Sequence, residues 1–337
     1  MEKITIIGGG SWGSAIANSL AEKGEDACLY IMEKQQYDLV VKTKTNPQYL
    51  KDFTFSNHLK FSNDFNKSVG EATVLIIAVP TNAVRSVLEQ IKELNVSPRT
   101  LVNLAKGLEQ NTHLRISEIA NEILPEFPFV ALNGPSHAEE VAKNLPTTLV
   151  ACSENHSEAV KIEKLFSTET LRIYYQDDLV GVEMGAALKN IIALAAGLTD
   201  GLQFGDNTKA ALMTRGIHEI TKLGIQMGAK PQTFLGLTGI GDLIVTCTSL
   251  HSRNRNFGYL IGQGKSVEEA MKIVDMVVEG YKTTKSAYEL SQEVGVEMPI
   301  TEKLYDVLYK GEDPKIAVME LMTRRSKHEN EGINDIS

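Results

Sequence analysis

The chain has 337 residues, of which 42% are hydrophobic and 23% charged, with a formal net charge of −9. These values are ordinary for a folded globular protein, so they argue against a largely disordered chain, and the length favours about two domains. The negative charge argues against broad nucleic-acid binding, although a phosphorylated small molecule needs only a local cluster of cations.

The apolar segments in the sequence are short. The first, residues 4–7, is too short for a signal-peptide core, and no run is expected to approach the ~20 residues that span a bilayer. Cys28, Cys152 and Cys247 are widely spaced, which does not suit a disulfide framework, and no cluster has metal-ligand spacing. We therefore expect a cytoplasmic protein with free thiols, no membrane insertion and no metal.

Strand-like and helical patterns alternate through the first 180 residues. The apolar run at residues 4–7 leads into a helix over Ser11–Lys23, which Gly24 is expected to end. Further strands are expected at residues 26–31, 73–79, 100–105, 129–132, 147–152 and 171–175. This alternation is typical of a doubly wound α/β sheet, so we predict a Rossmann-type dinucleotide-binding domain over residues 1–180.

The apolar spacing becomes mostly helical after about Asp178, and strong strand candidates nearly vanish. We predict a mainly α-helical domain over residues 181–325 that carries substrate-binding and catalytic groups. Residues 326–337 are expected to form a polar tail.

Gly8, Gly10 and Gly13 form a G-x-G-x-x-G pattern between a predicted strand and a predicted helix. In this context the first glycine permits a tight turn, the second lets a pyrophosphate approach the backbone, and the third allows close helix–strand packing. The helix N-terminus supplies N–H donors to the anion. A glycine-rich turn without a ligand is the alternative.

Glu33 stands 20 residues after Gly13, where the second strand is expected to end. A carboxylate at this place accepts the 2′-hydroxyl of the adenosine ribose and disfavours a 2′-phosphate, whereas the adjacent Lys34 would attract one. The expected cofactor is NAD(H), NADP(H) or both, and Glu33 favours NAD(H). A solvated charge on a turn is the alternative interpretation of Glu33.

Two lysines are candidates for ligand binding or proton transfer. Lys106 directly follows the strand that begins at Thr100, at the edge of the sheet where open α/β folds bind ligands. Lys189 lies in a segment of small and apolar residues, 183–193, where desolvation would lower its pKa and permit proton transfer near neutral pH. The alternatives are an exposed turn lysine at 106 and, at 189, a lysine whose amine reaches water.

Asp242 and Thr246 are four residues apart, so they share one face of a predicted helix. Asp242 is expected either to cap that helix or to orient a lysine amine or a substrate hydroxyl. Residues 251–255 hold a dense set of hydrogen-bond donors suited to phosphate, with a polar surface loop as the alternative.

Taken together, these motifs resemble the NAD(P)-dependent glycerol-3-phosphate dehydrogenase family in its bacterial form, from Ile4 to about Met322. The segments that carry the resemblance are residues 8–13, 105–109, 134–140, 187–192, 241–249, 251–254 and 277–280. The resemblance implies interconversion of sn-glycerol 3-phosphate and dihydroxyacetone phosphate, a homodimer, and supply of glycerol 3-phosphate for phospholipid synthesis.

The resemblance also implies roles for individual residues. Lys189 would exchange the proton of the C2 hydroxyl, with Thr246 assisting it. Lys106 would bind substrate and polarise the carbonyl, and Asp242 would touch substrate and hold the lysines. The other implied substrate-binding residues are Gly134, Ser136, Ser252, Arg253 and Asn254. Beside the three glycines and Glu33, the implied cofactor contacts are Ser11, Trp12, Tyr49, Lys106, Ala138, Arg253, Val277 and Glu279.

The sequence departs from the family pattern at Glu33, and two alternative functions remain open. Many bacterial members of the family carry a basic residue where this chain has Glu33, and they use NADPH readily. A 3-hydroxy-acid or keto-acid dehydrogenase would share the two-domain plan, but the cluster at residues 252–254 favours a phosphorylated substrate. A catalytically silent NAD(H)-binding sensor would need none of Lys106, Lys189 and Asp242, all of which are present.

Overall fold

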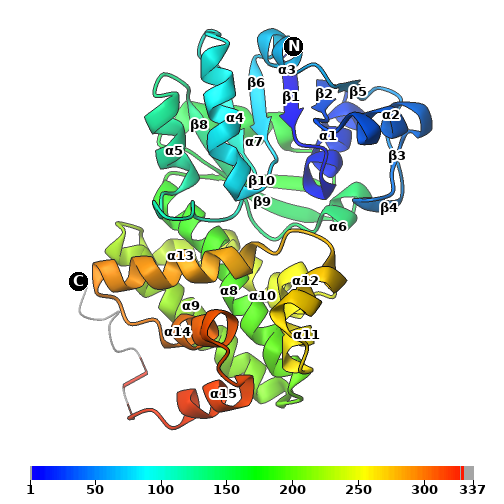
Figure 1. The fold of residues 1–337 in the computed structure, drawn as a ribbon. Coiled ribbons are helices and arrows are strands. Elements are labelled where there is room, and N and C mark those ends of the chain that lie inside the picture. The colour runs from blue at the N-terminus through cyan, green and yellow to red at the C-terminus, as the bar shows by residue number, and fades with distance from the viewer. Residues whose placement is uncertain (1, 327, 330–337) are drawn as a thin grey trace. The chain divides into compact units, whose positions relative to one another are not determined.

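The computed structural model describes residues 2–326, 328 and 329. The chain divides into two compact units, Met1–Lys106 with Ile116–Leu179 and Gly107–Arg115 with Val180–Ser337 (Figure 1). Each unit has its own hydrophobic core. Of the predicted polar tail, residues 327 and 330–337 lie outside the described residues.

The first unit is built on an eight-stranded sheet in the order β10-β9-β8-β7-β6-β1-β2-β5. Its strands are β1 (Lys3–Ile7), β2 (Asp26–Tyr30), β5 (Lys60–Ser62), β6 (Val74–Ile77), β7 (Thr100–Asn103), β8 (Phe129–Asn133), β9 (Thr147–Cys152) and β10 (Leu171–Gln176). Because β1 pairs in parallel with both β2 and β6, the strand order reverses beside β1. Open α/β sheets bind ligands at such a reversal.

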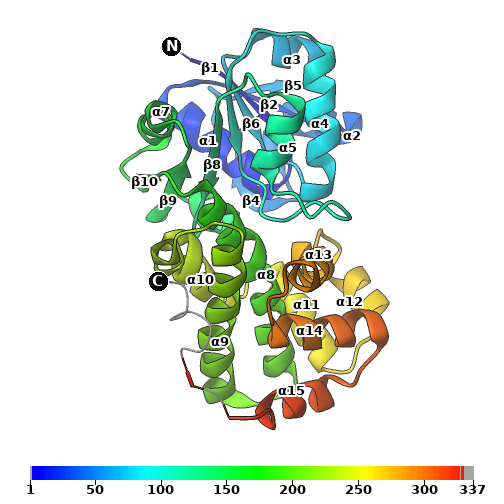
Figure 2. The same cartoon turned by 90° about the vertical axis from the view of Figure 1, so that its left-hand side faces the viewer.

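Helices cover both faces of this sheet. Figure 2 shows α1 (Ser11–Lys23) and α7 (His156–Phe166) on one face and α3 (Phe65–Glu71), α4 (Thr81–Glu93) and α5 (Ile116–Ile123) on the other. Every residue of β6 is buried, as expected for a strand covered on both sides. The remaining elements of the unit are α2 (Lys34–Thr43), α6 (Ala138–Ala142), β3 (Thr45–Asn46) and β4 (Leu50–Thr54).

These elements confirm the predicted doubly wound sheet, with two differences. β9 runs antiparallel to β8, because the chain between them contains only the five-residue helix α6, which packs against α1. The strands β3, β4 and β5 were not predicted, since they are largely exposed and no apolar run or alternation marks them.

The second unit is mainly helical, as predicted. Its helices are α8 (Leu179–Gly201), α9 (Gly205–Gln226), α10 (Asp242–Thr248), α11 (Arg253–Gly262), α12 (Val267–Val274), α13 (Glu279–Val294), α14 (Pro299–Tyr305) and α15 (Pro314–Met322), with a 3-10 turn, η1 (Pro231–Leu235), and two π-turns, η2 (Leu237–Gly241) and η3 (Asp306–Lys310). Residues 107–115 also belong to this unit, where Leu108 joins its core.

The helix α8 runs through the centre of the second unit. By length and composition it is apolar enough to cross a membrane, so the expectation that no segment approaches that length is wrong. Its apolar window is 94% buried inside the protein, which makes it a core helix.

The helices α8 and α11 cross in backbone contact. A Cβ atom added at Gly197 would overlap the carbonyl oxygen of Arg255, and one added at Gly258 would overlap that of Leu194. Only glycine permits this approach, so these positions determine how α11 lies on the helix that carries Lys189.

Candidate active site

The glycine loop of the first unit has the geometry of an anion site. Gly8 adopts φ +127°, and a Cβ atom there would lie 2.5 Å from the carbonyl oxygen of Ala78. A Cβ atom at Gly13 would overlap the carbonyl oxygen of Gly8, whereas one at Gly10 would meet nothing within 4 Å. Gly10 is the N-cap of α1 and supplies no side-chain cap. Open space before a 13-residue helix therefore fits a dinucleotide pyrophosphate.

Glu33 and Lys34 lie just beyond the end of β2, as expected. Glu33 is an exposed N-cap residue of α2. Lys34 is exposed as well, but its Nζ donates to Asp38 Oδ1 at 2.8 Å and lies 4.9 Å from the centroid of the Tyr37 ring. The Lys34 ammonium is thus held on its own helix.

Trp12 lies on the first turn of α1 and packs against a small apolar cluster that includes Ala15, Leu50, Ala138 and Val141. Two predicted cofactor residues, Trp12 and Ala138, are thus brought together. Among the described residues, the buried Nε1 of Trp12 has no hydrogen-bond partner.

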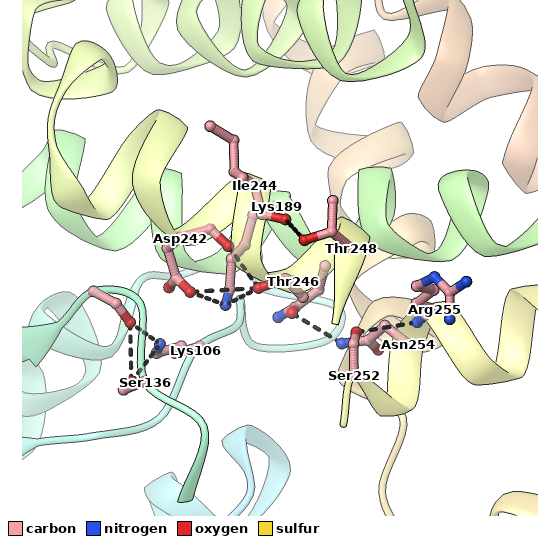
Figure 3. A network of polar contacts seen from close by, with 12 residues as sticks. Lys106, Ser136, Lys189, Asp242, Ile244, Thr246, Thr248, Ser252, Asn254 and Arg255 are labelled. Atoms are coloured by element: carbon pink, nitrogen blue, oxygen red, sulfur yellow. Dashed lines mark hydrogen bonds and ion pairs between the residues drawn. The ribbon is translucent and has the colours of Figure 1, made fainter. Parts of the chain in front are cut away.

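Three predicted substrate residues meet at the ends of β7 and β8 (Figure 3). Lys106 Nζ donates to the carbonyl oxygen of Gly134 at 2.8 Å and to Ser136 Oγ at 3.4 Å. Ser136 Oγ donates to the same carbonyl oxygen at 2.9 Å. Gly134 adopts φ +138°, a conformation that turns the chain sharply after β8.

The second unit assembles a buried ion pair around Lys189, in which the side chains of α8 and α10 point toward one another (Figure 3). Lys189 is 5% exposed, and its Nζ donates to Asp242 Oδ1 at 2.5 Å and to Thr246 Oγ1 at 2.7 Å. Thr246 Oγ1 in turn donates to the carbonyl oxygen of Asp242 at 2.6 Å. The predicted catalytic residues of this unit therefore form one cluster.

This cluster excludes two of the interpretations left open by the sequence. The Lys189 amine does not reach water along an exposed stem, because the side chain is buried. Gly241, not Asp242, is the N-cap residue of α10, and the Asp242 carboxylate accepts a hydrogen bond from Lys189 Nζ. Burial disfavours the charged form of a lysine, while the adjacent carboxylate favours it.

Residues 252–254 begin the helix α11, so the surface-loop alternative is wrong for Ser252 and Asn254, which are buried. Ser252 caps the helix by accepting the backbone N–H of Arg255 at 3.2 Å. Asn254 donates to Asn190 Oδ1 at 2.9 Å and accepts the backbone N–H of Gly280 at 2.8 Å. Arg253 is exposed.

Asn254 therefore connects two predicted segments of the second unit. Asn190 is the neighbour of Lys189 on α8, and Gly280 follows Glu279 at the start of α13. Sequence reasoning missed Asn190, although an asparagine beside a lysine in so apolar a helix was a signal. It also missed Gln36 and Asn46, which contact the glycine loop.

Within the described residues, no group of three or more His, Cys, Asp or Glu side chains is arranged to hold a metal ion. Cys28, Cys152 and Cys247 form no disulfide bond, and Cys152 and Cys247 are buried.

A doubly wound sheet with this glycine loop, in a chain that also carries a buried lysine–aspartate pair in a helical unit, defines a Rossmann-type nicotinamide-dependent oxidoreductase. Two family profiles match the chain, "NAD-dependent glycerol-3-phosphate dehydrogenase N-terminus" over residues 3–159 and its C-terminal counterpart over residues 178–319. The chain therefore belongs to the NAD-dependent glycerol-3-phosphate dehydrogenase family.

Individual relatives agree with this assignment. The chain is 50% identical to a glycerol-3-phosphate dehydrogenase (NAD(P)+) of Thermoanaerobacter sp. over 98% of this chain and 100% of the relative. It is 48% identical to one of Geobacillus kaustophilus over 100% and 98% of the two chains. The crystal structure of glycerol-3-phosphate dehydrogenase from Coxiella burnetii superposes with a TM-score of 0.93 at 36% identity, covering 96% of this chain and 99% of that one.

Family membership confirms the resemblance seen in the sequence. The chain is an NAD(P)-dependent glycerol-3-phosphate dehydrogenase, which interconverts glycerol 3-phosphate and dihydroxyacetone phosphate. The alternatives of a keto-acid dehydrogenase and of a silent sensor are not supported by these matches. The roles of the individual residues remain predictions.

Proposed function

We propose that this enzyme interconverts sn-glycerol 3-phosphate and dihydroxyacetone phosphate with Lys189 as the group that exchanges the proton of the C2 hydroxyl. The observation that carries this proposal is the buried contact of Lys189 Nζ with Asp242 at 2.5 Å and Thr246 at 2.7 Å. When bound, NAD(P)(H) supplies the hydride acceptor or donor.

In the oxidation, a neutral Lys189 amine accepts the hydroxyl proton at Nζ. Asp242 and Thr246 fix the position of this atom, and the Asp242 carboxylate stabilises the ammonium that forms. In the reduction, the ammonium donates its proton, and its positive charge stabilises the oxygen as negative charge develops there.

In the first unit, we propose that Lys106 binds substrate and polarises its carbonyl. The contacts of Lys106 with Gly134 and Ser136 support this role, because they hold the ammonium at the carboxyl edge of the sheet. In the second unit, the exposed Arg253 guanidinium at the start of α11 suits a phosphate group. We propose that Ser252 and Asn254 also bind the substrate. Their hydrogen bonds to the backbone N–H groups of Arg255 and Gly280 hold the start of α11 in place.

The proposed cofactor contacts are divided between the two units. The first unit supplies Gly8, Gly10, Ser11, Trp12, Gly13, Glu33, Tyr49, Lys106 and Ala138, and the second supplies Arg253, Val277 and Glu279. The open space beside Gly10 and the unpaired Nε1 of Trp12 support the assignments in the glycine loop.

We further propose that Glu33 gives the enzyme a preference for NAD(H). The ion pair of Lys34 with Asp38 supports this proposal, because it gives the adjacent lysine an anionic partner on its own helix. The ratio of kcat/KM for NADH to that for NADPH tests the preference, and a strong bias toward NADPH would exclude it.

The remaining proposals concern the protein in the cell. We propose a cytoplasmic homodimer that supplies glycerol 3-phosphate for phospholipid synthesis, with a dinucleotide-binding domain at residues 1–180 and a substrate domain at 181–325. Light scattering on the purified protein tests the dimer.

The central experiment is oxidation of NADH by dihydroxyacetone phosphate in the Lys189→Met variant. Loss of the general acid is expected to lower kcat by about 10³-fold while the Kd for NADH changes little. Lys272→Met, an exposed lysine on α12, is the matched control.

Because Lys189→Met leaves a buried carboxylate without its partner, a second variant is needed. Thr246→Val keeps the side-chain volume, removes one contact of Lys189 Nζ and is expected to lower kcat about tenfold, corresponding to one hydrogen bond of ~1.4 kcal/mol. Full turnover in a folded Lys189→Met protein would show that another group exchanges the proton.

A further inference from the structure

We infer that Gln36 and Asn46 are positioning residues for the dinucleotide, because they hold the carbonyl group of Gly9 and thereby direct the N–H of Gly10 toward the pyrophosphate. We call these two residues the amide clamp. The inference rests on the glycine loop as the pyrophosphate site and adds two residues outside the G-x-G-x-x-G pattern.

The amide clamp comes from two elements that follow the loop in the chain. Gln36 on α2 is 9% exposed, and its Nε2 donates to the carbonyl oxygen of Gly9 at 2.6 Å. Asn46 on β3 is 1% exposed, and its Nδ2 donates to the same oxygen at 2.9 Å and to Ser14 Oγ at 3.0 Å. Gln36 Nε2 also lies 3.2 Å from Asn46 Oδ1.

The chemistry of these contacts determines how the two amides are oriented. A carbonyl oxygen only accepts hydrogen bonds, so both side chains must present their NH₂ groups to Gly9. Its two lone pairs are then both used by donors from outside the loop. A buried oxygen with two donors is held far more firmly than one whose donors are water molecules.

The planarity of the peptide bond transmits this constraint to Gly10. The described chain contains no cis peptide bond, so the carbonyl of Gly9 and the N–H of Gly10 lie in one rigid plane and point in opposite directions within it. With the oxygen held toward α2 and β3, the N–H faces away from both elements. The space beside the Cα atom of the same residue is open, since a Cβ atom added at Gly10 meets nothing within 4 Å.

The amide clamp also accounts for Gly9, which the sequence pattern leaves unexplained. A Cβ atom at Gly9 would lie 3.0 Å from Gln36 Nε2 and 3.0 Å from Ile31 Cγ1, so a side chain there would press against the clamp. The side of the Gly9–Gly10 peptide that faces α2 is therefore filled by the Gln36 and Asn46 amides.

The clamp further links three segments with proposed cofactor contacts. Gln36 lies on the first turn of α2, three residues after Glu33. The backbone N–H of Tyr49 donates to the carbonyl oxygen of Asn46 at 3.1 Å. A shift of either amide therefore moves the pyrophosphate loop relative to these segments. Because the clamp is uncharged, it orients the loop without competing for the diphosphate charge.

The test compares ligands with and without a pyrophosphate. In the Gln36→Met variant, the Kd values of NADH and of ADP-ribose are expected to rise together by about tenfold, the equivalent of ~1.4 kcal/mol. The Kd of adenosine, which has no phosphate, is expected to stay within about twofold. Calorimetry on the full-length protein measures all three. Gln35→Met, an exposed residue on the same helix, is the matched control and is expected to bind all three ligands normally.

Two further variants are expected to change the Kd of ADP-ribose by different amounts. They also provide a test that does not depend on the folding of Gln36→Met. Gln36→Glu keeps the shape but turns an oxygen toward the Gly9 carbonyl, so it is expected to weaken ADP-ribose more than Gln36→Met does. Ser14→Ala removes only the second acceptor of Asn46 and is expected to weaken ADP-ribose by about twofold to threefold. kcat at saturating NADH is expected to stay near the wild-type value in each.

Two results would overturn the inference. One is an unchanged Kd for ADP-ribose in both Gln36 variants. The other is an equal loss of adenosine and ADP-ribose affinity in the folded Ser14→Ala protein, which would indicate a merely structural role. Wild-type binding of NADH is measured in the same series, so a failure of the cofactor site itself would be seen separately.

Discussion

The cofactor loop of the first unit and the catalytic cluster of the second unit are built in different ways. The loop places its three glycines within residues 8–13, and the amides of Gln36 and Asn46 from later elements hold the carbonyl oxygen of Gly9 between them. Lys189 and Asp242, in contrast, are 53 residues apart and meet only because α8 and α10 pack together. A short segment supplies the backbone donors of an anion site, whereas every partner of a buried proton-transfer group comes from the tertiary structure.

The largest effect is expected from a variant that separates α8 from α11 in the second unit and leaves every proposed catalytic residue in place. It tests whether the catalytic cluster depends on helix packing. Gly258→Ala places a Cβ atom on the carbonyl oxygen of Leu194, so α11 must move away from α8. Because a displacement of ~1 Å can cost about 10²-fold in rate, we expect kcat to fall by at least that factor. The free energy of unfolding should fall by ~1–3 kcal/mol.

Steady-state kinetics and urea unfolding check this prediction. Gly70→Ala on α3 is the control, since its added methyl group meets nothing within 4 Å and should change neither quantity appreciably. Normal turnover by Gly258→Ala would show that the cluster tolerates movement of α11.

The next two variants compare a glycine beside open space with a tightly packed glycine in the loop of the first unit. Gly10→Ala places its Cβ atom in open space and Gly10 already has φ −73°, so the free protein should keep its Tm. Gly13→Ala overlaps the carbonyl oxygen of Gly8 and should lower the Tm by several degrees. Both should raise the Kd of NADH by at least about tenfold, or ~1.4 kcal/mol.

Differential scanning calorimetry and fluorescence titration with NADH separate the two effects. If Gly10→Ala lowers the Tm as much as Gly13→Ala does, the space beside Gly10 is not free for a ligand.

The last prediction concerns stability alone and a buried carboxyl group in the second unit. Glu219 on α9 accepts the backbone N–H groups of Ile300 at 2.7 Å and Thr301 at 3.3 Å, at the start of α14. Burial raises the pKa of Glu219 from 4.5 to about 7, although these hydrogen bonds oppose the shift. The native protein therefore binds more protons than the unfolded chain between these two pKa values.

The free energy of unfolding should accordingly fall as the pH rises from about 4.5 to about 7 and then stay level with respect to this group. Glu219→Gln should remove that slope, and urea unfolding at several pH values measures it. Glu302→Gln, an exposed residue on α14, should keep the wild-type slope. An unchanged slope in Glu219→Gln would mean that Glu219 does not titrate in this range.

Much of the first unit was predictable from its sequence. The helix Ser11–Lys23 was predicted with both ends, and Gly24 indeed ends it in the left-handed conformation, with φ +96°. Seven of the eight strands of the main sheet were found, because short runs rich in apolar and β-branched residues mark most of them. The antiparallel β9 was not predictable, since strand direction depends on how the connection packs and leaves no pattern in the strand itself.

The candidate site was predictable only in part. Lys189 stood out as a charged residue among small apolar ones, and Asp242 and Thr246 followed from their helical spacing. Nothing in the sequence, however, showed that Asn254 would bind Asn190 and Gly280, because these residues are far apart in the chain.

The sequence by itself determined the dinucleotide loop, the division into α/β and helical parts, and the family. These features follow from local spacing, which fixes backbone conformation within a few residues. Only the tertiary structure decided which side chains share a hydrogen bond, such as Lys189 with Asp242 or Gln36 with Gly9. Those contacts depend on how whole elements pack together, which no local pattern in the sequence records.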